Sequence, residues 1–282
     1  MRRVWAVSLL MLFSLPVLGD GPAATIRFLS QSEAREALTT GAERRYYARL
    51  QLPEMRAKTG LALQNMTLEA AREQVREAYG ARAEEFSADE QAALRDIVTA
   101  LQPSLRTRAP LYARTPWVFI KVDATIEGGL PHTRGENIVL SDALLARVVQ
   151  VRAKGASGAP VSLWNLLVHE QTHVLQRHHP ELFANLYTQS LGFRQVALAP
   201  APPWLIERNV VNPDAPRSLP AAFQDLSALP DFVRAFPLQD ELFHPNEISA
   251  GLLAAIITGS GIEHPEHPLW NKTRAWADQA LR

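Results

Sequence analysis

The segment Trp164–Pro180, "WNLLVHEQTHVLQRHHP", contains four of the eight histidines of the chain. His169 and His173 are four residues apart, so on an α-helix their imidazoles lie on one face, one turn apart. Both can then reach one metal ion at the roughly 2.0–2.1 Å of a zinc–nitrogen bond. Glu170 lies about 100° around such a helix and can take a proton from a water molecule bound to the metal. The spacing therefore predicts a metal-dependent hydrolytic site.

The residues around this motif are strongly apolar and have helical spacing, which predicts a helix over about Val161–Arg177. Histidines and a glutamate buried in such a helix are costly without a partner, and a metal ion supplies one. Two other hypotheses stay open, and the second of them treats H-E-x-x-H as a chance occurrence. One is a zinc-binding envelope protein without activity, acting as a scaffold or an inhibitor. The other is a metal-free helical envelope protein.

The stretch "LLVHEQTHVLQ" resembles the active-site helix of the zincin metallopeptidases. This resemblance implies that His169 and His173 are zinc ligands, that Glu170 is the general base, and that the substrate is a peptide or a protein. The resemblance covers only the metal motifs and the strands that precede them.

A catalytic zinc ion needs a third protein ligand, and His179 is one candidate. It completes H-E-x-x-H-x-x-Q-x-x-H, which is close to the metzincin pattern but has Gln176 where that family has a glycine. A continuous helix places His179 about 280° around from His169, off the metal face. Pro180 favours a bend there, but no methionine follows the motif to form the metzincin methionine turn.

Glu247 is the favoured third ligand. It lies 74 residues after His173, on a predicted helix that opens after Pro245. Its surroundings, N-E-I-S-A, resemble the glutamate helix of the gluzincins, which implies that Glu247 ligates zinc. Many gluzincins have an aspartate four residues later that orients the first histidine, and this chain has Gly251 there. Asn165, one turn before His169, is a weaker candidate for that orienting role.

Peptide hydrolysis also needs a donor for the oxyanion of the transition state. His244 is the first candidate, and Tyr187, His132 and Arg134 are the others. By the same resemblance, a strand borders the cleft and pairs with an extended substrate, and the strand predicted at "NIVLS", residues 137–141, has the matching position in the sequence.

Residues 26–105 have a predominantly helical pattern. A capping box opens one predicted helix at Ser87, and Pro103 marks its expected end. A second predicted helix has Thr67 as its N-cap and Gly80 just past its end.

A strand over 117–125, a loop, and a second strand over 137–141 are expected before the motif. The remaining predictions are helices over about 141–155, 246–258 and 268–281, and a proline-dense loop over 199–230 that either packs on the surface or walls a substrate cleft. These elements predict an α+β fold, mostly helical and zincin-like, with a small mixed sheet before the active-site helix. The expected divisions are a signal peptide over 1–19, a helical subdomain over 20–110 and a metallohydrolase domain over 111–282.

The first 19 residues have the features of a secretory signal. Arg2 and Arg3 precede an apolar run over Val4–Val17, with Gly19 before the expected cut. A transmembrane anchor is the alternative, but the run is shorter than the ~20 residues of a membrane span. No stable membrane insertion is expected once the signal is removed. The formal net charge of zero argues against nucleic acid as a partner. The sequence therefore predicts an exported zinc hydrolase, periplasmic or secreted, and makes no prediction of its oligomeric state.

Overall fold

The computed structural model of the protein describes residues 24–154, 161–194, 202–207, 210–214, 230–236, 244–262 and 264–282. The predicted signal peptide lies outside these ranges, as does most of the proline-dense segment. The strands are β1 Ile26–Phe28, β2 Ala83–Glu84, β3 Trp117–Val122, β4 His132–Arg134 and β5 Asn137–Ser141. The longer helices are α1 Gln31–Thr39, α3 Leu52–Thr59, α4 Leu68–Ala81, α5 Ala88–Arg108, α7 Asp142–Ala153, α8 Val161–His178, α12 Pro245–Thr258 and α13 Pro268–Ala280.

Short helical segments connect these elements. They are α2 Arg44–Tyr47, α6 Pro110–Arg114, α9 Pro180–Asn185, α10 Pro203–Ile206 and α11 Pro230–Ala235, with 3₁₀ turns at Gly41–Glu43 and Ile126–Gly129 and a π-helical turn at Leu186–Ser190. The expectation of a mostly helical α+β protein with a small mixed sheet is confirmed. The helix predicted around the histidine motif is also confirmed, as α8.

The sheet has the strand order β1-β3-β5-β4, and β2 pairs with β3. β3 is parallel to β1 and to β5, whereas β2 and β4 run antiparallel to their partners. The strand at 137–141 is therefore an interior strand, and the expectation that it borders the cleft is wrong. The edge strand next to β5 is β4, which lies inside the stretch predicted as a loop and is joined to β5 by a tight turn at Gly135.

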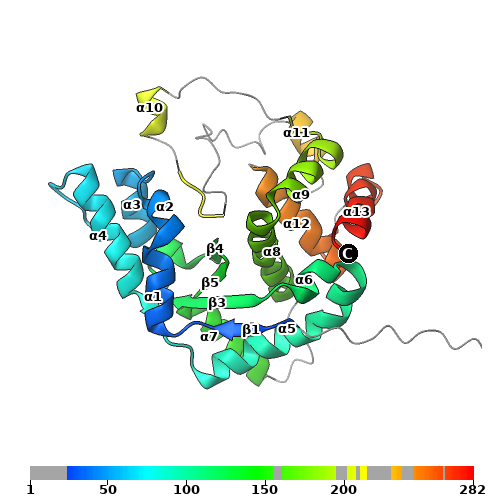
Figure 1. Cartoon of the computed structure of the whole chain (residues 1–282), viewed down its shortest axis with the longest axis horizontal. Helices are drawn as coiled ribbons and strands as arrows, with labels where there is room; N and C mark the ends of the chain where they lie inside the picture. The colour runs from blue at the N-terminus through cyan, green and yellow to red at the C-terminus, as the bar shows by residue number, and fades with distance from the viewer. Residues whose placement is uncertain are drawn as a thin grey trace, which may run out of the picture.

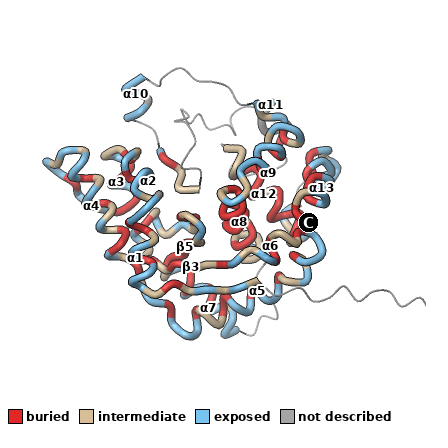
Figure 2. Tube along the Cα trace, in the orientation of Figure 1, coloured by how far each residue is buried: buried red, intermediate tan, exposed pale blue. Residues whose placement is uncertain are grey.

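Alternate residues of the central strands point into two different cores. Phe119 and Ile138 contribute to a core with α5, α8 and α12, whereas Ile120 and Val139 contribute to a core with α1–α4. Figure 1 shows α1–α4 on one side of the sheet and α8, α9, α12 and α13 on the other. Figure 2 shows that α8 and α12 are buried along much of their length.

Two predicted helix ends are wrong. α5 continues past Pro103 to Arg108 because its later turns are bound to the end of α12, where Arg108 Nη1 donates to Ile256 O at 2.7 Å. Leu105 is also fully buried, so packing outweighs the loss of one helical hydrogen bond at the proline. Gly80 lies inside α4, and a Cβ there would stand 2.7 Å from Thr39 Cγ2. Close packing against α1 therefore explains Gly80.

Elements before residue 110 do not all lie together. β1 belongs to the same sheet as β3 and β5, and α5 packs in the core of α8 and α12. Only α1–α4 form a group of their own on the opposite face of the sheet. Among the helices of the described ranges, none has the length and apolarity needed to cross a membrane.

Candidate metal centre

α8 brings the two motif histidines to one point, as the four-residue spacing predicts. His169 Nε2 and His173 Nε2 are 3.0 Å apart, with their rings nearly perpendicular. His173 is fully buried, and His169 keeps a small exposed fraction. The pair therefore presents two nitrogen atoms to the same small volume, open on the His169 side.

Glu247 adds a third potential ligand atom from α12. Its Oε2 lies 3.2 Å from His169 Nε2 and 3.1 Å from His173 Nε2. α12 is rich in small and aliphatic residues, and Ala250, Leu253 and Ala254 are buried in it. Such a surface lets two helices approach closely, which brings a carboxylate encoded 74 residues away to the histidine pair.

The three atoms form a nearly equilateral triangle with sides of 3.0–3.2 Å. Three corners of a tetrahedron around zinc, at its usual bond lengths, are about 3.3 Å apart, so the donor set fits this ion closely. The electrostatics agree. Burial lowers the pKa of His173, but Glu247 outweighs that effect and raises it to about 10. The protein therefore favours positive charge where the three atoms meet.

Glu170 lies beside this triangle and is also buried. Its Oε2 accepts a hydrogen bond from Thr133 Oγ1 at 3.0 Å. Burial and the nearby carboxylate of Asp214 raise the pKa of Glu170 to about 7, against the lowering effect of the two histidines. A carboxylate with a pKa near neutrality, next to a cation site, has the properties of a general base.

Two amides hold the candidate ligands in place. Gln176 Oε1 lies 2.8 Å from His173 Nδ1, and Gln176 Nε2 donates to Asn246 O and to Ser249 Oγ at 2.9 and 3.0 Å. Because an amide oxygen accepts, Nδ1 of His173 carries a proton, which leaves Nε2 as the nitrogen that would ligate a metal ion. Asn212 Nδ2 donates to Glu247 Oε1 at 2.6 Å, which leaves Oε2 directed at the histidines.

His179 is not part of the cluster. It is the N-cap residue of α9, where the chain leaves α8. Within the described residues, the group of potential ligands that contains His169 and His173 is completed by Glu247. His178 lies near Glu136, at 3.4 Å. The metzincin-like alternative is therefore not supported by the geometry.

The predicted oxyanion donors are placed differently. His244 is the N-cap of α12, and its Nδ1 accepts the N–H of Asn246 at 3.1 Å. Burial lowers its pKa, so the neutral ring is favoured, and its role stays a prediction. Tyr187 donates its hydroxyl to Asn246 Oδ1 at 3.0 Å, which occupies the proton that an oxyanion would need.

His132 and Arg134 are wrong as oxyanion donors. Thr133 points to Glu170, so its two neighbours on β4 point to the opposite face of the sheet. Arg134 lies there above the ring of Tyr46, at 3.9 Å, and binds Glu43.

Asn165 is also wrong as the partner of His169. Its side chain bonds to Thr258 and to Ser260 O, at the end of α12.

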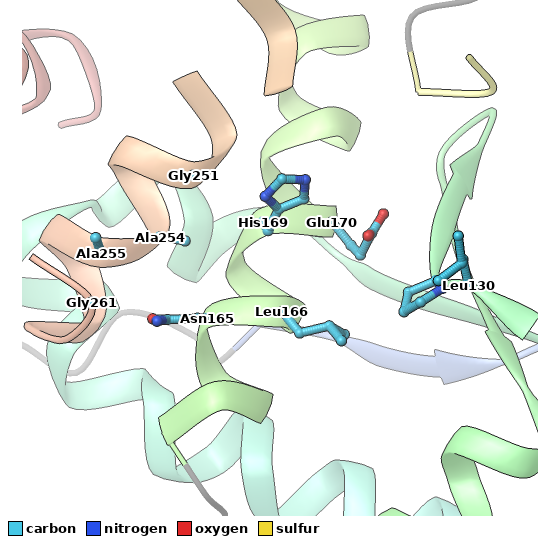
Figure 3. Close-up of a pocket in the computed structure, with 10 residues that line it drawn as sticks. Leu130, Asn165, Leu166, His169, Glu170, Gly251, Ala254, Ala255 and Gly261 are labelled. Carbon is cyan, nitrogen blue, oxygen red and sulfur yellow. The ribbon is translucent and has the colours of Figure 1, made fainter. Parts of the chain in front are cut away.

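A cavity of about 360 Å³ opens next to His169 and Glu170. Figure 3 shows both side chains at its rim, with Leu130 and Leu166 on one side and Asn165 toward α12. The rest of the lining comes from small or apolar residues, namely Pro131, Gly251, Ala254, Ala255 and Gly261. Apart from the two rim residues, the lining is uncharged, so the cavity suits an apolar group of a bound molecule.

Comparison of the chain with protein-family models, with curated proteins and with solved structures gave no match.

Proposed function

We propose that the protein is a zinc-dependent hydrolase of the gluzincin type, with His169, His173 and Glu247 as the ligands. The observation that carries this proposal is the triangle of three converging donor atoms beside the buried carboxylate of Glu170. A zincin-like fold is part of the proposal. It is supported by an antiparallel edge strand, β4, that lies beside the motif helix.

A zinc ion held by His169, His173 and Glu247 would supply a Lewis acid and would lower the pKa of a water molecule at the site to about 7. Glu170 then takes the proton of the attacking water and passes it to the leaving group. The hydroxyl of Thr133 holds the carboxylate of Glu170 in position during both transfers. Burial keeps bulk water away from this carboxylate, which strengthens its interaction with nearby charge.

Peptide bonds are the proposed substrate, in a peptide or a protein. The cavity beside His169 and Glu170 supports this, because it can take up an apolar side chain next to the reacting centre. The backbone of Thr133 is already bound, its N–H by Asp214 and its C=O by Arg177. A substrate therefore does not pair with β4 at Thr133.

Export is also part of the proposal, and it is supported by the signal-like composition of residues 1–19. A mature chain that is periplasmic or secreted meets peptide substrates outside the cytoplasm.

The test is Glu170→Gln, measured with zinc-loaded protein on a peptide library. The amide cannot accept the proton, so hydrolysis falls by about 10²–10⁴-fold while the bound zinc remains. Glu181→Gln is the matched control, because Glu181 is an exposed residue on α9, and it retains full activity.

Hydrolysis retained in Glu170→Gln would remove Glu170 from its role. A wild-type protein that binds zinc but cleaves no peptide would favour a non-catalytic zinc-binding protein instead.

A further inference from the structure

Four consecutive residues, Val211–Asp214, are each held by a different element of the fold. α3 binds both backbone groups of Val211: its N–H donates to Glu54 Oε1 at 2.6 Å, and its C=O accepts from Lys58 Nζ at 3.0 Å. The side chain of Val211 is buried in the core of α1–α4. Figure 1 shows this segment, in yellow, above β4 and between α3 and α8. Val211 is thus anchored to the helices on the far side of the sheet from the metal centre.

The next three residues reach the metal centre. Asn212 donates to Glu247 Oε1 of α12 at 2.6 Å. The carbonyl of Pro213 accepts from Arg177 Nη2 of α8 at 2.7 Å. Asp214 Oδ1 accepts the N–H of Thr133 of β4 at 2.6 Å. A further hydrogen bond, from the backbone N–H of Asp214 to Asn212 Oδ1 at 2.8 Å, fixes the side chain of Asn212 relative to the backbone of Asp214.

These contacts support the two groups that do the proposed chemistry. Asn212 holds one oxygen of Glu247 and so directs the other oxygen to the histidines. Asp214 fixes the backbone of Thr133, whose hydroxyl binds Glu170. The segment therefore lies behind a metal ligand and behind the general base, and the cavity at His169 stays open.

The anchor on α3 is itself tightly specified. The ammonium of Lys58 has three N–H donors, and it has three acceptors at hydrogen-bond distance: Glu127 Oε2 at 2.6 Å, Tyr46 Oη at 2.9 Å and Val211 O at 3.0 Å. The Lys58 side chain is only 9% exposed, so loss of any acceptor is costly. The carbonyl of Val211 is thus held in place because the buried ammonium of Lys58 needs it as a hydrogen-bond acceptor.

We propose that Lys58 and Glu54 of α3 are positioning residues of the metal centre, which act through Val211 to place Asn212 against Glu247 and Asp214 against Thr133. This inference rests on the proposed function. It gives α1–α4 a role in metal binding, although no contact joins their described residues to the three proposed ligands.

The experiment measures the zinc dissociation constant by competition with a chromogenic chelator, on the full chain. Loss of a group that orients a ligand lowers metal affinity about 10–100-fold, which is the result expected for Asn212→Ala. Lys58→Met is expected to lower the affinity on the order of 10-fold. Melting of each variant in the presence of a strong chelator reports the stability of the fold separately.

Lys121→Met is the matched control. The Lys121 side chain is 12% exposed and pairs with Glu84 and Glu90, which have no contact with the metal centre among the described residues. This variant loses two partly buried ion pairs but keeps zinc affinity within about twofold of wild type. If Lys58→Met does not fold, Glu54→Leu is tested in its place. Its control is Glu54→Gln, which keeps an acceptor for Val211 N–H and is expected to retain zinc affinity.

A double-mutant cycle completes the test. Lys58→Met and Asn212→Ala act through one segment, so their effects are not additive. The zinc affinity of the double variant should lie within about twofold of that of Asn212→Ala alone. Lys121→Met and Asn212→Ala combine additively. The inference is overturned if wild type binds zinc and hydrolyses peptides while Asn212→Ala and the α3 variants bind zinc as tightly as wild type does. That result leaves the proposed function intact. A folded wild type without zinc affinity overturns both.

Discussion

At the scale of single residues, Gln176 favours Glu247 over His179 as the third ligand of the proposed metal site. A glycine at this position would let the chain turn and bring His179 back to the metal. The glutamine instead stays in α8, binds His173 Nδ1, and donates to Asn246 O of α12. The same amide thus orients one ligand and ties its helix to the helix that bears Glu247.

Paired substitutions separate the two candidate ligands. Glu247→Ala removes the only carboxylate of the triangle, so zinc affinity falls by at least about 100-fold, more than for loss of an orienting group. His179→Ala leaves the triangle intact and keeps wild-type affinity. Equilibrium dialysis against buffered zinc measures both. Equal losses in the two variants, or a loss only in His179→Ala, would restore the metzincin-like alternative.

The sequence was sufficient to predict the residues whose placement is local. His169, Glu170 and His173 share one helix, so their spacing already determines their relative positions. Glu247 needed a resemblance in addition, because its approach depends on how α12 packs. Thr133, Asn212 and Asp214 had no such signal: Thr133 lay in a predicted loop, and the other two lay in a proline-dense stretch without periodicity.

Long elements were predictable at the scale of helices and strands because their signals are local and repeated. Thr67, Ser87 and Ser141 each accept a backbone N–H at the start of their helix, as their sequence contexts predict. The strands β1, β2 and β4 have only two or three residues each, which is too short for a period-2 pattern to emerge. Tertiary pairing alone determines these strands.

Gly80 provides the test at this scale. Alanine normally stabilises a helix interior over glycine by about 1 kcal/mol, but here a Cβ meets the methyl group of Thr39 at 2.7 Å. Gly80→Ala is therefore expected to lower the free energy of unfolding by about 1–3 kcal/mol, measured by urea denaturation. Thr39→Ser removes that methyl group and keeps the hydroxyl that bonds to Arg35 O. Thr39→Ser should therefore lower the free energy of unfolding less in the Gly80→Ala background than in wild type. Equal losses in the two backgrounds would contradict the clash.

At the scale of the whole molecule, the sheet lies between two hydrophobic cores. A buried charge cluster lies where α3 meets the 3₁₀ turn at Ile126–Gly129, before β4. Glu127 is at its centre: Tyr46 and Tyr79 donate to one oxygen, and Lys58 donates to the other. Burial raises the pKa of Glu127, but Lys58, His132 and the Tyr46 hydroxyl lower it to about 2. The cluster links the distant α1–α4 group to the segment that supports the metal centre.

This shift predicts acid sensitivity. The pKa of Glu127 is lower in the folded chain, about 2, than its ordinary value of 4.5, so the unfolded chain takes up the proton first as the pH falls. The stabilisation from Glu127, on the order of 3 kcal/mol, is present above pH 4.5 and is lost as the pH falls toward 2. The difference in the free energy of unfolding between wild type and Glu127→Gln should shrink over that range. A difference that does not change with pH would contradict this assignment.

The zinc content of the folded protein tests the central claim most directly. Purified mature protein is exposed to zinc, passed through a desalting column, and analysed for metal by mass spectrometry, with circular dichroism to confirm folding. We expect about one zinc ion per chain, since three protein ligands complete one catalytic site. A correctly folded chain that stays free of metal after this treatment would contradict the account.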